Sequence, residues 1–182
     1  MNAAQLLERT REFLRDTHAD VQEFSDELIN ATLADGLNYI NAMYFLNESV
    51  IEINSNLVIF PVQVLNVRQV LVNGVPVSVS PRDLLNREIY ASVGSDLQTL
   101  KIHNAGEHPR VVVLANFALE FDEKFDISPL YMNALVYWAC AELSQISLRE
   151  NNHAIAAAFS KRFEGELARL NKLFYNTATG LG

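Results

Sequence analysis

The side chains that could bind a metal ion or act as nucleophiles are scattered along the sequence. A zinc site needs several Cys and His ligands at short spacing, but the chain has a single cysteine, Cys140, and its four histidines stand in separate segments. Cys140 lies in an apolar stretch, which favours a small buried residue over a reactive thiolate. The histidines are expected at the surface, in loops or near helix ends: His18, His103, His108 and His153.

Carboxylates gather at one place, between residues 120 and 126. They could hold Ca²⁺, yet the spacing and glycine of an EF-hand loop are missing, so a solvated link before a helix is expected: Glu120, Asp122, Glu123 and Asp126. The sequence has no Gly-rich phosphate loop, no dinucleotide fingerprint and no Gly-x-Ser-x-Gly elbow. It therefore predicts no catalytic residue, no cofactor and no metal, in a protein that is not an enzyme.

Aromatic side chains near the end of the sequence could line a ligand pocket, but their helical spacing favours a hydrophobic core: Tyr131, Tyr137, Trp138, Phe159, Phe163 and Phe174. The helix expected around Trp138 is apolar almost all round, and one neighbouring helix cannot cover so much surface. We therefore predict Tyr131, Tyr137 and Trp138 as candidates for a subunit interface.

The charge of the chain opposes binding to nucleic acid. Its 22 acidic and 14 basic residues give a net charge of −8, whereas tight binding to phosphates needs clustered Lys and Arg. Arg9, Arg11 and Arg15 alternate with Glu8 and Glu12, which predicts surface ion pairs rather than a nucleic-acid patch. An acidic wall would still let DNA slide past without adhering; a charged, solvated surface that aids solubility is the equally weighted alternative.

Nothing in the sequence predicts a membrane or secreted protein. No apolar run approaches the ~20 residues of a membrane helix, and the first residues lack the basic and then apolar pattern of a signal peptide. With one cysteine, no internal disulfide can form, which fits a reducing compartment.

The elements that would position these side chains are four predicted helices, with strands between the second and the third. Apolar residues recur at helical spacing over residues 3–16, 25–44, 129–149 and 153–175. Ser25 and Ser128 are good N-caps, and Pro129 suits a first helical turn. Alternating apolar residues over 50–53, 57–60, 62–72, 75–79, 89–93, 97–103 and 110–121 predict strands.

Two strand pairings are predicted from the loops between strands. Asn73-Gly74 supplies the positive φ angles of a tight hairpin turn between 62–72 and 75–79. Pro76 cannot donate to a neighbouring strand, so we expect it at an edge or near a bulge. Residues 97–103 are expected to pair with 110–121 across Asn104-Ala105-Gly106.

The fold predicted from these elements is α+β: mainly a helical bundle of four main helices, with a β-rich insert between the second and third. Residues 1–44 and 128–175 would form the bundle, and residues 45–127 the insert. The small, polar residues 176–182 predict a flexible C-terminal tail.

The order of these parts, together with four short motifs, resembles one known family. The motifs are Phe13-Leu14-Arg15-Asp16, Phe24-Ser25-Asp26-Glu27-Leu28, Val67-Arg68-Gln69-Val70-Leu71-Val72-Asn73-Gly74 and Phe125-Asp126-Ile127-Ser128-Pro129-Leu130-Tyr131. Over residues 6–174 the chain looks like the head-to-tail adaptor, or connector, proteins of tailed bacteriophages. It departs from their pattern at Phe24, where a tryptophan is often found.

The resemblance implies a structural protein of the virion neck, between capsid and tail, assembled in the host cytoplasm. Such adaptors form a homo-oligomeric ring, usually a dodecamer, that binds the portal protein and tail or nozzle proteins. DNA passes through the ring without specific binding. Their C-terminal segment reaches into the portal ring, so the resemblance implies these portal-docking candidates: Tyr175, Asn176, Thr177, Ala178, Thr179, Gly180, Leu181 and Gly182.

Two other functions remain open. A tail-completion, neck or baseplate subunit would bind tail proteins rather than the portal. A small ligand-binding or enzymatic α+β protein would instead be a stable monomer whose aromatic residues surround an enclosed cavity with clustered polar groups.

Overall fold

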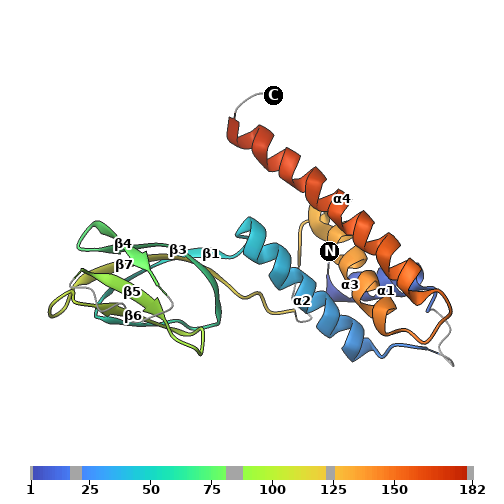
Figure 1. Cartoon of the computed structure of the whole chain (residues 1–182), viewed down its shortest axis with the longest axis horizontal. Helices are drawn as coiled ribbons and strands as arrows, with labels where there is room; N and C mark the ends of the chain where they lie inside the picture. The colour runs from blue at the N-terminus through green and yellow to red at the C-terminus, as the bar shows by residue number, and fades with distance from the viewer. Residues whose placement is uncertain (1, 17–21, 81–87, 122–125, 180–182) are drawn as a thin grey trace. The chain divides into compact units, whose positions relative to one another are not determined.

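The chain forms two compact units, one helical and one built from strands. The computed structural model describes residues 2–16, 22–80, 88–121 and 126–179, with only the backbone given for 174–179. The helical unit comprises Met1–Leu37 and Glu120–Gly182, and the β unit comprises Asn38–Leu119. Figure 1 shows the elements of each unit.

The helical unit contains α1 (Ala3–Leu14), the first part of α2 (Asp26–Tyr44), α3 (Pro129–Ile146) and α4 (Asn152–Thr179). Caps explain where two of these helices begin. Asn2 and Gln5 form a reciprocal capping box at α1, and the Ser128 side chain accepts from the Leu130 N–H at α3. Helix α4 packs along α3 (Figure 1). The core between the helices consists largely of fully buried aliphatic residues: Leu6, Ile29, Leu33, Leu135, Leu143 and Leu170.

A buried arginine joins the end of α1 to the start of α2. Arg11 donates from Nη1 to Asp16 Oδ2 at 2.8 Å and from Nη2 to the Phe24 carbonyl at 3.0 Å, and it also pairs with Asp26. Asp16 Oδ1 accepts from the Glu23 N–H at 2.8 Å. The prediction of a surface ion pair was therefore wrong for Arg11, because its partners come from the following loop rather than from its own helix.

The β unit is a seven-stranded sheet that curls into a near-barrel, with the order β1-β7-β3-β4-β5-β6-β2. Its strands are β1 (Glu48–Asn54), β2 (Leu57–Ile59), β3 (Val64–Val72), β4 (Val75–Val79), β5 (Tyr90–Val93), β6 (Thr99–His103) and β7 (Arg110–Phe117). All pairs are antiparallel except β4 with β5. The inner side chains form a core of their own, which includes Val58, Val70, Leu100, Val111 and Val113.

This sheet corrects the predicted fold class. Four helices are present, but the protein is β-rich and is not mainly a helical bundle with a small insert. The short strands were recognised one by one, whereas their joining into one large sheet depends on partners far apart in sequence. Such pairings leave no local pattern, because each strand alternates in the same way whatever its neighbour.

The predicted hairpin is confirmed, and the second pairing is wrong. Asn73 and Gly74 have φ angles of 51° and 82° and join β3 to β4. Pro76 lies opposite Leu71, while β4 pairs with β5 only from Ser78 onward, so no neighbour needs a donor from Pro76. Strand β6 pairs with β2 and β5, and β7 lies between β1 and β3. On β7, Val111, Val113 and Ala115 lie in the core of the unit, whereas Val112 and Leu114 on the other face stay partly exposed.

Buried asparagines join the end of α2 to the sheet within the β unit. Asn41 Nδ2 donates to the Phe117 carbonyl at 2.7 Å, and Asn116 Nδ2 donates to the Asn41 carbonyl at 2.9 Å. The Asn47 N–H donates to both side-chain oxygens, at 3.1 Å to Asn41 and 3.2 Å to Asn116. Asn41 and Asn116 are fully buried, so these bonds replace those that water would otherwise make.

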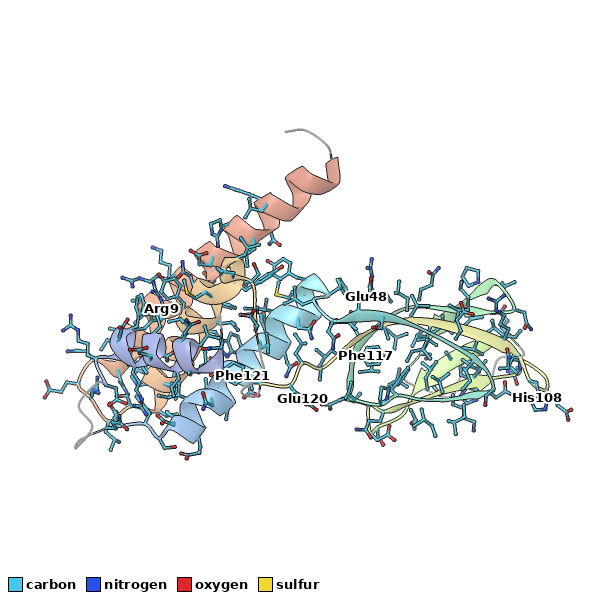
Figure 2. The ribbon with its side chains drawn as sticks, turned by 180° about the vertical axis from the view of Figure 1, so that it is seen from behind. Arg9, Glu48, His108, Phe117, Glu120 and Phe121 are labelled. Carbon is cyan, nitrogen blue, oxygen red and sulfur yellow. The ribbon has the colours of Figure 1, made fainter. Side chains whose placement is uncertain are left out.

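A further asparagine closes the ends of the β unit. The Leu119 N–H donates to Asn38 Oδ1 at 2.9 Å, and these two residues are the last and first of the unit. Glu48 and Phe117 lie near the same end, while His108 lies at the opposite end of the sheet (Figure 2).

We predict that Asn41→Ala lowers the free energy of unfolding by about 1–3 kcal/mol, because it removes partners from buried polar groups. Asn54→Ala is the matched control, since Asn54 is exposed at the end of β1, and it should change stability by less than about 0.5 kcal/mol. Urea denaturation followed by circular dichroism measures both. Equal effects of the two substitutions would contradict a stabilising role for the buried network.

Candidate interaction surfaces

The end of α4 is the first candidate surface. The helix spans 28 residues and continues to Thr179, beyond the predicted end at 175. Among the residues of α4 whose side chains the structure describes, Leu170 is the last buried one, and Asn171, Lys172 and Leu173 are exposed. Nine residues of α4, or roughly 14 Å of helix at 1.5 Å per residue, follow Leu170. Figure 1 shows this end projecting past α1 and α3.

The eight portal-docking candidates all fall at this end of the chain. Tyr175, Asn176, Thr177, Ala178 and Thr179 have helical backbone. Gly180, Leu181 and Gly182 lie outside the described residues. A portal contact through these residues stays a prediction.

The three interface candidates lie against other side chains of their own unit. Tyr131 is buried. The ring of Tyr137 lies edge-on to Phe13, with centroids 5.5 Å apart, and Trp138 lies edge-on to Phe163 at 5.3 Å. Tyr137 and Trp138 keep part of their surface exposed, so an additional subunit contact through them stays a prediction.

Trp138 also explains a glycine in α2. A Cβ added to Gly36 would lie 2.5 Å from Trp138 Cδ1 and 2.9 Å from Cγ. These atoms are close to the root of the indole and cannot move without displacing the ring. Gly36 is thus required for close packing of α2 against α3, despite its cost to helix stability.

We predict that Gly36→Ala lowers the free energy of unfolding by about 1–3 kcal/mol through overpacking against Trp138. Gly165→Ala in α4 is the matched control, since a Cβ there meets no atom within 4 Å. It should stabilise the protein by about 0.5–1 kcal/mol. If Gly36→Ala also stabilised the protein in urea denaturation, the close packing would be refuted.

The residues considered for chemistry are not brought together. His103 stacks on Tyr90 in the sheet, His108 lies in the β6–β7 connection, and His153 is exposed in the first turn of α4. His18 falls outside the described residues, as do Asp122 and Glu123 of the acidic cluster. Within residues 2–16, 22–80, 88–121 and 126–179, no three His, Cys, Asp or Glu side chains form a metal-binding group. No helix in this part of the chain is long and apolar enough to cross a membrane.

Cys140 is buried in α3, as its apolar surroundings predicted. Burial raises the pKa of its thiol to about 12, although the charge of Arg162 acts in the opposite direction. At neutral pH the thiol is therefore protonated and a poor nucleophile.

We predict that Cys140 resists alkylation by iodoacetamide at pH 8 in the folded protein, because the raised pKa leaves only about one thiol in ten thousand ionised there. Mass spectrometry after a timed reaction measures the modification. The protein unfolded in guanidinium is the control, and it should be modified within the same time. Rapid modification of the folded protein would show an accessible thiolate.

Comparison with protein families identifies one match. The family model described as "SU10 adaptor protein" matches residues 1–180, and it represents a phage head-to-tail adaptor family. No sequence among the curated proteins matches this chain. The match confirms the resemblance to phage adaptors.

Proposed function

The chain belongs to the SU10 adaptor family of phage head-to-tail adaptors, and we propose that it binds the portal ring and extends the DNA channel toward the tail. The family is one of structural proteins rather than enzymes. It implies a component of the virion neck that interacts with portal and tail proteins.

The projecting end of α4 carries the portal proposal. A helix that is already formed before binding loses less conformational entropy on docking than a disordered tail does. Exposed helices commonly bind by laying one face into a groove of the partner. The backbone of residues 175–179 continues α4 beyond Leu170, and we propose that this segment binds the portal.

Charge and symmetry support the proposed ring and channel. Copies arranged around an axis make heterologous contacts, in which two different faces of each subunit meet. Partly exposed surface on Tyr137 and Trp138 suits one of those faces. A net charge of −8 suits a channel that DNA crosses without adhering, because like charges repel.

We predict that the full-length protein cosediments with a matching portal ring in ring stoichiometry, while a chain ending at Phe174 does not. A third variant, in which residues 175–182 are replaced by a Gly-Ser segment of equal length, separates the loss of sequence from the loss of length. It should also fail to bind.

The portal proposal fails if the full-length chain remains unbound, or if all three chains bind equally. In the first case, cosedimentation with tail proteins would test the alternative of a tail-completion or baseplate subunit. Circular dichroism of the shortened chain must show that its core is folded.

A further inference from the structure

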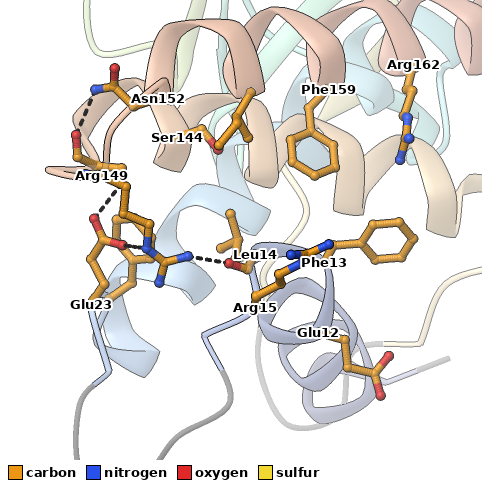
Figure 3. A pocket seen from close by; sticks show the side chains of 13 residues that line it. Glu12, Phe13, Leu14, Arg15, Glu23, Ser144, Arg149, Asn152, Phe159 and Arg162 are labelled. Atoms are coloured by element: carbon orange, nitrogen blue, oxygen red, sulfur yellow. Dashed lines mark hydrogen bonds and ion pairs between the residues drawn. The ribbon is translucent and has the colours of Figure 1, made fainter.

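A cavity of about 590 Å³ opens in the helical unit, where the end of α1, the start of α2 and the α3–α4 connection meet. Its lining combines arginines with aromatic rings, a composition that is frequent at the energetic centres of protein interfaces. Figure 3 shows the side chains around it. The lining residues that matter here are Phe13, Arg15, Glu23, Arg149, Phe159 and Arg162.

One wall of the cavity is held by an internal charge network. Arg149 Nη1 donates to the Leu14 carbonyl at 2.6 Å, and its Nε lies 2.5 Å from Glu23 Oε2. The Ser147 hydroxyl donates to Glu23 Oε1 at 2.6 Å. Glu23 and Arg149 therefore neutralise each other, and this wall contributes shape rather than charge.

The remaining two arginines keep their charge available. In the described part of the chain, neither Arg15 nor Arg162 has a carboxylate within salt-bridge distance. Arg15 extends from α1 and Arg162 from α4, both at the cavity (Figure 3). Glu12 is the other acidic lining residue, and its carboxylate points away from the two guanidinium groups (Figure 3).

Aromatic rings orient one of these guanidinium groups. The Cζ atom of Arg162 lies 5.8 Å from the centroid of Tyr137 and 5.6 Å from that of Phe159. The cation lies toward the face of each ring, and a guanidinium has five N–H donors, so it can still offer two of them to a carboxylate in parallel bonds. Phe13 and Phe159 provide apolar surface beside this position.

The charge of the whole unit decides which anion fits. The helical unit has nine basic and sixteen acidic residues, a net charge of −7. A long polyanion such as DNA is repelled by that surface as a whole, whereas at physiological salt a single carboxylate responds mainly to charges within about 8 Å of it. The cavity therefore favours a short acidic segment.

We propose that this cavity docks an acidic peptide segment of a partner protein, with a carboxylate between Arg15 and Arg162 and an apolar side chain against Phe13 and Phe159. The site is distinct from the end of α4, and it can function whether or not α4 binds the portal. It gives the helical unit a second docking position for a protein of complementary charge.

The test uses the full chain and two fluorescein-labelled octapeptides, one built from Glu and Phe and the other with every Glu replaced by Gln. Fluorescence anisotropy should show binding of the acidic peptide only. Arg15→Gln and Arg162→Gln should each raise the dissociation constant about tenfold, the loss expected for one charge-assisted contact. Lys161→Gln is the matched control: it removes the same charge from the neighbouring, exposed position of α4 and should change affinity less than twofold.

Three results would overturn the proposal. Equal binding of the acidic and neutral peptides would remove the role of charge. If Lys161→Gln weakened peptide binding as much as the two cavity variants do, the peptide would be attracted by the overall charge of the protein rather than by the cavity. If a short DNA duplex displaced the peptide, and if the same two arginine variants failed to bind the duplex, the site would be assigned to nucleic acid. Thermal melting of all variants must match that of the parent chain, since neither guanidinium has an ionic partner among the described residues.

Discussion

The helical unit depends on one buried charge pair, Arg11 with Asp16. Both side chains are almost inaccessible, with 9% and 1% exposed, and either charge alone in that position would cost several kcal/mol. The pair is tolerated because every part of it is bonded. Arg11 also donates to the Phe24 carbonyl, and Asp16 accepts from the backbone of Glu23 and Phe24. These bonds hold Asp16 beside Glu23 and Phe24, and they tie both to Arg11 of α1.

One wall of the candidate docking cavity depends on these bonds. Fixing the backbone at Glu23 places its carboxylate against Arg149, which in turn reaches the Leu14 carbonyl at the end of α1. The next residue, Arg15, has a left-handed φ of 55° where the helix ends, and its side chain lines the cavity. A buried ion pair thus determines the shape of a solvent-facing site, although it is not itself exposed there.

The sequence predicted what depends on neighbouring residues and missed what depends on distant ones. The Ser128 cap and the Asn73-Gly74 turn are local signals, and the structure contains both. The pairing of β7 with β1 and β3 joins segments about sixty and forty residues apart, and no local pattern encodes it. Arg11 was expected to pair within its own helix, but the fold supplied stronger partners from the next loop. The arginine cavity was missed for the same reason, because Arg15 and Arg162 come to line one cavity only in the folded unit.

The hydrogen bond between Asn38 and Leu119 affects how a chain with this fold can evolve. It joins the first and last residues of the β unit. Segments whose ends meet can be excised, transplanted or circularly permuted as one piece, because a linker of a few residues reconnects them. The β unit can therefore be replaced as one piece. Its strands can lengthen, shorten or give way to another fold, while its first and last residues stay joined by one hydrogen bond.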